Sequence, residues 1–177
     1  GQDPDDLAAR VAFHLHRLYL TGKSLINAET GISRDIAADL AAARRSLTQH
    51  AVIELAGSLG VDHAELSRDL TIDEQREWFF YRVSARHSRK VWNNAHAAWN
   101  SAGWSCRHAA EVMGLDESYL RRQTHSLTTD PATLSLPPAA RLTTALALPL
   151  GPAQLLPDVH RKDWFALSVT IEPRCGP

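Results

Sequence analysis

The sequence predicts an all-α protein with two helical domains in tandem, and two observations carry this prediction. Apolar residues recur at spacings of three and four up to about residue 157, which is the period of amphipathic helices. Similar turn spacings also recur about 80 residues apart, which indicates an imperfect internal repeat. We expect a first domain at 5–72, a helical linker at 73–90, a second domain at 91–157 and a tail at 158–177.

Short helices with small-residue turns fill the first domain. Leu7, Val11, Leu15 and Leu18 recur at spacings of four and three, so they share one face of a first helix. The segment TGIS at 30–33 is a turn, and Gly60 separates two further short helices. The first domain is therefore predicted as a succession of short helices.

An aromatic-rich segment follows at 71–102. Thr71 and Glu74 form a capping-box pattern, so we expect one long helix from here, or two helices broken near 84–88. Its large side chains are expected to form a core between the two domains rather than a ligand or partner surface. They are Trp78, Phe79, Tyr81, Val83, Trp92 and Trp99.

The tail changes its period after the proline-rich loop at 130–142, where Pro138 suits the first turn of a helix. Every second residue from 165 to 171 is apolar, which predicts a short C-terminal β-strand. Such a strand needs a partner within the chain, from a second copy, or from a part of the protein outside this sequence.

The composition is that of an ordinary globular protein, with 44% hydrophobic and 22% charged residues. No run of about 18 apolar residues predicts a membrane span, and the start GQDPDDLAAR does not have the pattern of a signal peptide. The two cysteines, Cys106 and Cys175, do not form a disulfide framework. We therefore expect a cytoplasmic protein.

Charge is distributed unevenly, although the net charge is −1. Residues 1–80 hold 8 Lys/Arg and 13 Asp/Glu, whereas residues 81–177 hold 11 Lys/Arg and 7 Asp/Glu. Because phosphate attracts basic surfaces, the second half is the part expected to contact nucleic acid.

Known catalytic and metal-binding motifs are missing from the sequence. It contains no H-E-x-x-H, C-x-x-C, zinc-finger spacing, glycine-rich phosphate loop or G-x-S-x-G. His14 and His16 stand two apart on a helix and point in different directions, as do Cys106 and His108. We therefore expect no enzyme, no cofactor and no metal site.

The segment SCRHAAEVMGLDESYLRRQTHS, residues 105–126, has the spacing of a helix-turn-helix corner. Ala110 is small enough for two helices to cross, Gly114 tolerates a left-handed turn, and Leu120 faces inward. Asp116 is placed to cap the second helix. Two packed helices without any DNA contact share this pattern, so a purely structural corner stays open as an alternative.

The two halves share glycines and serines at matching positions. Gly22, Ser24 and Gly31 align in this way with Gly103, Ser105 and Gly114, after a gap of two residues in the first copy. With these motifs in order, the chain resembles the lambda-repressor-like (Cro/C1-type, XRE) DNA-binding family over residues 8–70 and 88–156. The second copy is the closer match. The resemblance implies about five short helices in each half, with the third helix in the major groove.

This resemblance implies a DNA-reading face on the second copy. Arg121 and Arg122 are expected to contact phosphate or guanine. Asp116 and Glu117 oppose phosphate, unless Glu117 accepts a hydrogen bond from a cytosine amino group. The other expected contacts are Ser105, Arg107, Ser118, His125, Arg89 and Lys90.

The first copy is expected to contribute less to DNA binding. Its presumed recognition helix, SRDIAADLAAARRS, offers Arg34, Arg44 and Arg45, but the surrounding half is acidic. Contact with DNA and contact with another protein both stay open for it. A third place repeats the corner spacing, with Ala56, Gly60 and Leu66.

The sequence thus predicts a sequence-specific DNA-binding transcription regulator. The resemblance implies a regulator of the kind that phages and mobile elements use. Double-stranded DNA is the expected partner, with RNA polymerase or another regulator as a further one and a homodimer as one arrangement. The alternative is a protein-binding module, an antiactivator or adaptor, that uses the same helical fold without DNA.

Overall fold

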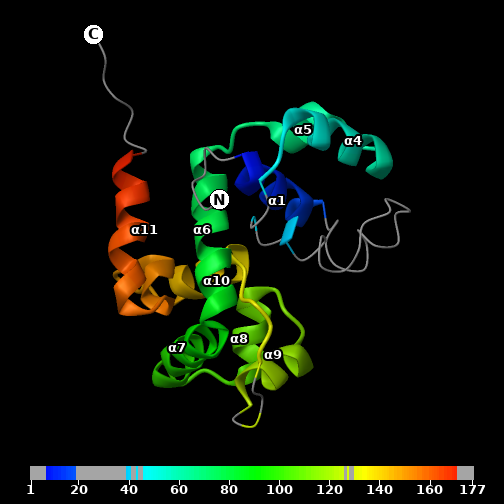
Figure 1. Cartoon of the computed structure of the whole chain (residues 1–177). Helices are drawn as coiled ribbons and strands as arrows, with labels where there is room; N and C mark the ends of the chain where they lie inside the picture. The colour runs from blue at the N-terminus through cyan, green and yellow to red at the C-terminus, as the bar shows by residue number, and fades with distance from the viewer. Residues whose placement is uncertain are drawn as a thin grey trace. The chain divides into compact units, whose positions relative to one another are not determined.

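The computed structural model describes residues 7–18, 39, 40, 43, 46–125, 127 and 130–170, and only the backbone of 168–170. They divide into two compact units, Gly1–Thr71 and Ile72–Pro177 (Figure 1). The described residues are mostly helical and contain no β-strand, so the all-α prediction is confirmed for them. Within this part of the chain, no helix has both the length and the apolar character needed to cross a bilayer.

In the first unit, two helices pack on a third, short one. Both α1 (Leu7–Arg17) and α4 (Gln49–Leu59) contact α5 (His63–Ser67). The buried side chains of this unit's core are Val11, Leu15, Leu40, Val52, Ala56 and Leu66. Val11 and Leu15 thus confirm the inner face predicted for the first helix, whereas the prediction is wrong for Leu18, which is exposed beyond the end of α1.

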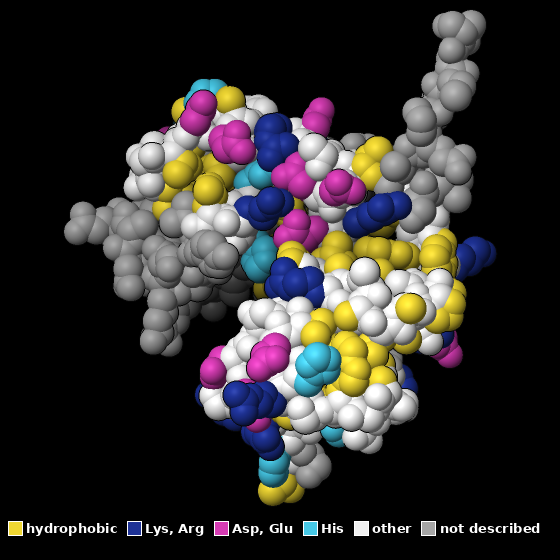
Figure 2. All heavy atoms as spheres, turned by 180° about the vertical axis from the view of Figure 1, so that it is seen from behind, with side chains coloured by type: hydrophobic (Ala, Val, Ile, Leu, Met, Phe, Trp, Pro, Cys, Tyr) yellow, Lys and Arg dark blue, Asp and Glu magenta, His cyan; other side chains and the backbone are white. Residues whose placement is uncertain are grey.

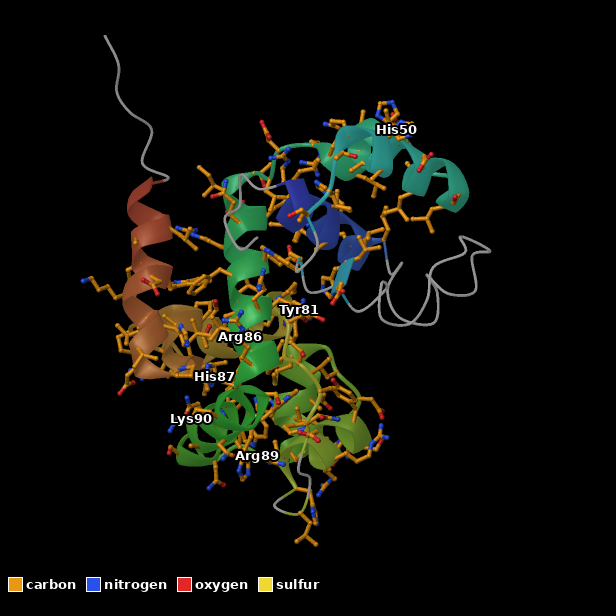
Figure 3. All side chains as sticks on the ribbon, viewed as in Figure 1. His50, Tyr81, Arg86, His87, Arg89 and Lys90 are labelled. Carbon is orange, nitrogen blue, oxygen red and sulfur yellow. The ribbon has the colours of Figure 1, made fainter. Side chains whose placement is uncertain are left out.

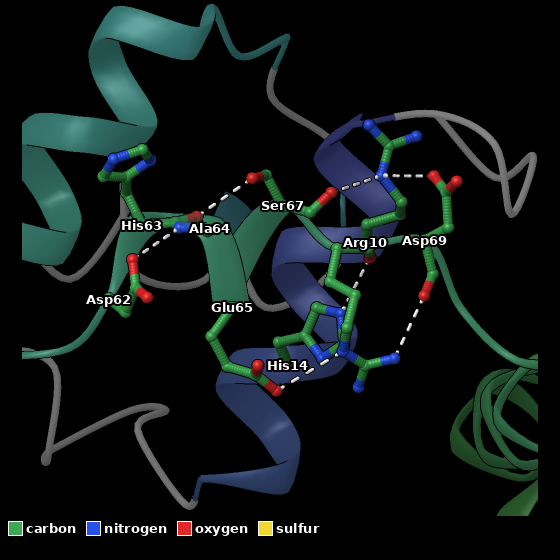
Figure 4. A network of polar contacts seen from close by, with 9 residues as sticks. Arg10, His14, Asp62, His63, Ala64, Glu65, Ser67 and Asp69 are labelled. Carbon is green, nitrogen blue, oxygen red and sulfur yellow. Dashed lines mark hydrogen bonds and ion pairs between the residues drawn. The ribbon is translucent and has the colours of Figure 1, made fainter.

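Polar side chains of α1 bind the end of α5 (Figure 4). The Nε of Arg10 donates to the Ser67 carbonyl at 3.0 Å, and the Nε2 of the buried His14 lies 3.0 Å from the Arg68 carbonyl. Because a carbonyl only accepts, the His14 ring carries its proton on Nε2. The last carbonyls of a helix have no partner within the helix, so these two side chains hold α5 in place.

The second unit surrounds a larger core. Its helices are α6 (Ile72–Arg86), α7 (Ser88–Ser101), α8 (Cys106–Met113), α9 (Glu117–Thr124), α10 (Leu136–Ala145), the 3-10 helix η1 (Gly151–Leu155) and α11 (Asp158–Thr170). Helix α10 contacts α6, α7, α8 and η1, so it occupies the middle of the unit. The largest fully buried side chains here include Trp92, Trp99, Phe80, Met113 and Leu120.

The aromatic-rich segment forms two helices, α6 and α7, which break at His87. This outcome decides between the one-helix and two-helix alternatives. Phe80 and Val83 from α6 and Trp92 and Trp99 from α7 lie in the core of the second unit. The segment 73–90 is thus part of this unit instead of a linker.

Two hydrogen bonds join this segment to the loop before α10. The Trp92 indole donates to the Ala132 carbonyl at 2.7 Å, and the buried Ser84 hydroxyl accepts from the Leu134 amide at 2.9 Å. A core residue with a satisfied polar group fixes its neighbours more strictly than apolar contact alone. These bonds join α6 and α7 to the loop before α10 within the second unit.

The C-terminal strand prediction is wrong for the described residues, because α11 continues to Thr170. Trp164 is buried, and its ring lies 6.2 Å from that of Phe80 and 6.4 Å from that of Phe79. The half-buried or buried positions 160, 161, 164 and 167 follow a helical period. Phe165 is exposed, so the alternation that predicted a strand does not describe a buried face. Residues 171–177 lie outside the described part.

Candidate nucleic-acid interface

Helices α8 and α9 form a tight corner through Gly114. Gly114 has φ 70°, and it ends α8 with two bonds, from the Leu115 amide to the Ala110 carbonyl at 2.9 Å and from the Gly114 amide to the Glu111 carbonyl at 3.3 Å. This is a Schellman motif, which turns the chain sharply after a helix. Asp116, in extended conformation, then precedes α9, but its side chain makes no capping hydrogen bond to this helix, so the predicted cap is not formed.

The inner side of the corner is packed as the spacing predicts. Ala110, Met113 and Leu120 are buried, and Leu115 packs against the same core. Burial of these side chains fixes α9 against α8 and α7, which it contacts. The outer side of α9 is therefore presented on a rigid support.

An arginine of α10 completes the corner. The Nε and Nη2 of Arg141 donate to the Met113 carbonyl at 3.1 and 2.8 Å. A Cβ added to Gly114 would lie 3.1 Å from Nη2 of Arg141, so the guanidinium occupies the space that only glycine leaves. Sequence reasoning missed Arg141, because its partner is a backbone carbonyl 28 residues earlier.

The exposed face of α9 carries both charges. Arg121 donates to Glu117 at 2.7 Å, and the side chains are 65% and 38% exposed. This hydrogen bond raises the pKa of the Arg121 guanidinium. The hydroxyl of Ser118 donates to the Asp116 carboxylate. The two acidic residues that oppose phosphate are thus each engaged by a neighbour on the same helix.

Arg122 is exposed next to Arg121. Burial raises the pKa of the Tyr119 phenol, and the positive charge of Arg122 lowers that pKa by less. Tyr119 in turn packs edge-on against Trp92, with ring centroids 6.3 Å apart. Tyr119 therefore joins α9 to the aromatic side chain of α7. On the face drawn in Figure 2, basic and acidic side chains lie intermixed at the level where Figure 1 shows α8 and α9.

His125 and Arg89 meet at the end of α9. The Nη1 of Arg89 donates to the His125 carbonyl at 3.4 Å, and Arg89 is half-buried. The Nδ1 of His125 accepts from the Leu127 amide at 3.2 Å, so a neutral ring carries its proton on Nε2 and can donate from there. Arg89 supports the end of α9, while the neighbouring Lys90 is exposed on α7 (Figure 3).

Ser105 and Arg107 lie at the start of α8. The Ser105 hydroxyl accepts from the His108 amide at 3.1 Å, which caps the helix and leaves its own proton available to donate. Arg107 pairs loosely with Glu111, at 3.7 Å across one exposed turn. The residues of the second copy that are expected to contact DNA therefore lie on or next to α7, α8 and α9 of one unit. Those expected in the first copy, Arg34, Arg44 and Arg45, lie outside the described residues.

The corner geometry recurs in the first unit, between α4 and α5. Gly60 has φ 70°, the Val61 amide donates to the Ala56 carbonyl at 3.0 Å, and Ala56 and Leu66 are buried. Asp62 caps α5 by accepting from the Ala64 amide at 3.0 Å. The spacing Ala56–Gly60–Leu66 equals that of Ala110–Gly114–Leu120. The outer face differs, because α5 (HAELS) carries no arginine.

An open hollow lies beside α9. Its lining residues are His96, Trp99, Cys106, Arg121, Thr124 and His125. Burial raises the pKa of the Cys106 thiol, and the nearby charge of Arg121 lowers it by less, so the thiol stays protonated near neutral pH. Among the described residues, no group of three or more His, Cys, Asp or Glu side chains is arranged to hold a metal ion.

Comparison of this chain with protein-family models, with curated proteins and with solved structures finds no match.

Proposed function

We propose that this protein binds double-stranded DNA as a transcription regulator and reads the major groove through α9. The observation that supports this most is the rigid α8–α9 corner with Arg121 and Arg122 exposed on its outer side. A helix that enters the major groove exposes its outer face to DNA, while its inner face packs against the rest of the domain. The packing of Leu120 against the core supplies that hold.

The positions along α9 agree with a reading face. Leu120 and Gln123 are the buried residues of this helix. Residues 117, 118, 121, 122 and 125 follow at spacings of one, three and four, so they share the opposite side. Arginine binds guanine N7 and O6 with two hydrogen bonds, and serine and histidine donate to phosphate or to bases.

The ion pair between Arg121 and Glu117 competes with DNA, and magnitudes decide the competition. An exposed pair of this kind stabilises a helix by about 0–1 kcal/mol. A two-bond contact from arginine to guanine contributes roughly 1–3 kcal/mol of discrimination. The arginine therefore changes partner when a guanine is presented, and Glu117 is then free to accept from a cytosine amino group.

The start of α8 provides a second contact, with the DNA backbone. The first amides of a helix point outward and its dipole favours an anion. Ser105 adds a hydroxyl that can donate, and Arg107 adds a charge whose pairing with Glu111 is long, at 3.7 Å. A phosphate at this place would fix the register in which α9 lies in the groove.

Fluorescence anisotropy of the full chain with labelled duplex DNA tests the proposal. Genomic fragments or random duplexes serve as probes, at two salt concentrations. We expect a complex that weakens steeply with salt, because each phosphate contact contributes roughly 0.9 to the log–log slope. No complex with any duplex at low salt would refute DNA binding.

The second candidate function is a protein-binding module without DNA contact. The mixed charge of α8 and α9 favours it, since Asp116 and Glu117 balance Arg121 and Arg122. In that case an antiactivator or adaptor would present the same corner to another regulator. If the protein captures a regulator in a pull-down whose yield does not change with salt, and if it binds no duplex DNA, the protein-binding function is supported over DNA binding.

A further inference from the structure

Two histidines from distant parts of the chain meet on the second unit. The Nε2 atoms of His87 and His160 lie 3.3 Å apart, and their ring centroids lie 5.2 Å apart. His87 stands at the break between α6 and α7, where Figure 3 labels it, and His160 lies in the first turn of α11. The proposed DNA contact uses neither residue.

We propose that His87 and His160 together bind one divalent transition-metal ion of the Zn²⁺, Ni²⁺ or Cu²⁺ class. The lone pair of an imidazole nitrogen points away from the ring centre. Zinc lies about 2.0–2.1 Å from each nitrogen that binds it, so two Nε2 atoms 3.3 Å apart can both reach one ion at a tetrahedral angle of about 110°. The proposal does not depend on DNA binding.

A direct hydrogen bond between the two rings is the alternative to a bound metal ion, with one Nε2 as the donor and the other as the acceptor. A nitrogen–nitrogen separation of 3.3 Å is longer than the usual range of about 2.7–3.2 Å for N–H donors to oxygen. The separation of the two nitrogens thus allows either a shared proton or a shared metal ion, and the titration described below distinguishes the two.

The backbone holds both histidines in position. The His87 amide donates to the Val83 carbonyl at 3.0 Å, and the His160 amide donates to the Pro157 carbonyl at 3.0 Å. Helix α11 also packs on α6, so the two rings face each other without any rearrangement of the unit. A site that is already formed loses less entropy on binding than one that must fold around its ion.

The chemistry of the donors selects the class of ion. Imidazole suits zinc, copper and nickel, while magnesium and calcium require oxygen ligands. Among the described residues no third His, Cys, Asp or Glu completes the set, so water would fill the other positions. Arg86 and Lys90 flank His87, and Asp158 on α11 is paired with Arg161 at 2.8 Å. These basic neighbours weaken cation binding, so the affinity is expected to be below that of a four-ligand structural zinc site.

Isothermal titration of ZnCl₂ and, separately, NiCl₂ into the full chain tests the site. We expect one ion per chain near pH 7.5, and weaker binding near pH 5.5 because protons compete for imidazole. His87→Ala and His160→Ala should each lower the affinity at least about tenfold, since each removes half of the protein ligands. The matched control is His63→Ala, which changes an exposed histidine of the first unit and should leave the binding unchanged.

Nitrogen-15 spectra of the histidine rings in the unmodified chain give a second readout that needs no variant. Zinc should shift the Nε2 signals of two histidines together, with a midpoint equal to the calorimetric one. Saturable one-to-one binding that survives in the double variant His87→Ala/His160→Ala would overturn the proposal. Absence of any saturable binding would overturn it equally and would leave a hydrogen-bonded pair.

Discussion

The guanidinium of Arg121 donates to the carboxylate of Glu117 one turn earlier on α9, at 2.7 Å. This pair occupies the centre of the face that is proposed to read DNA. Glu117 therefore acts on binding in two ways, because it repels phosphate and it retains the arginine. Both effects weaken DNA binding when the DNA carries no cytosine within reach of Glu117.

Glu117→Gln should tighten binding to non-specific duplex DNA by several fold. The substitution removes one negative charge from the proposed interface and releases Arg121 from its ion pair. Anisotropy titration at low salt measures the change. The control is Asp163→Asn, which alters the net charge equally on the exposed side of α11. Equal tightening by both variants would mean that net charge, and not the α9 face, governs binding.

Gly114→Ala should destabilise the second unit by about 2–3 kcal/mol. A left-handed conformation costs a non-glycine residue about 1–2 kcal/mol, and the added Cβ would also press against Arg141. Gly103→Ala is the matched control, because Gly103 has φ 76° and open space around its Cβ position. Thermal or urea unfolding of the two variants should therefore differ, and Arg141→Ala should reduce that difference. Equal losses would show that Arg141 is not a steric neighbour.

Ala147→Gly should stabilise the protein by up to about 1 kcal/mol. Ala147 follows α10 with φ 51°, in the region that glycine adopts without strain. Its amide donates to the Thr144 carbonyl at 3.0 Å, so the turn is defined by bonds that glycine preserves. Ala145→Gly, at the end of α10, should instead destabilise, because glycine weakens a helix. Urea denaturation would contradict the account if both variants moved the midpoint in the same direction.

Acid should weaken the first unit through His16. Burial, and to a smaller extent the charge of Arg17, lower the pKa of this ring in the folded state. The unfolded chain then binds the proton more readily than the folded chain. The stability that the neutral His16 ring allows is therefore fully present above about pH 6.5, and the free energy of unfolding decreases as the pH falls below that value. His16→Gln should flatten the pH dependence of unfolding between about pH 7.5 and pH 5. His63→Gln, which changes an exposed ring, should leave the slope as it is.

Local spacing predicted the corners well. The order of Ala110, Gly114 and Leu120 determines a Schellman turn between two helices, and the structure contains that turn. This succeeds because a left-handed glycine and its two hydrogen bonds depend only on neighbouring residues. The same spacing at Ala56, Gly60 and Leu66 gives the same turn, for the same reason.

Features that depend on distant contacts were not predictable. Phe165 and its alternating neighbours suggested a strand, but Trp164 packs on Phe80 and draws α11 into the second unit. Arg141 reaches the Met113 carbonyl from another helix, and no local pattern marks it. The pairing of His87 with His160 spans 73 residues, so only the tertiary fold brings these two rings together.

The most direct test of the central claim is the selection of binding sites from random duplex DNA by the unmodified chain and by Arg121→Ala/Arg122→Ala. Lys162→Ala, at an exposed basic residue of α11, controls for the loss of a positive charge outside α9, and the single variants Arg121→Ala and Arg122→Ala match it in charge. We predict that the unmodified chain and the control select one common motif. The double variant should keep only weak, salt-sensitive and sequence-independent binding. Selection of the same motif by the double variant would contradict reading by α9.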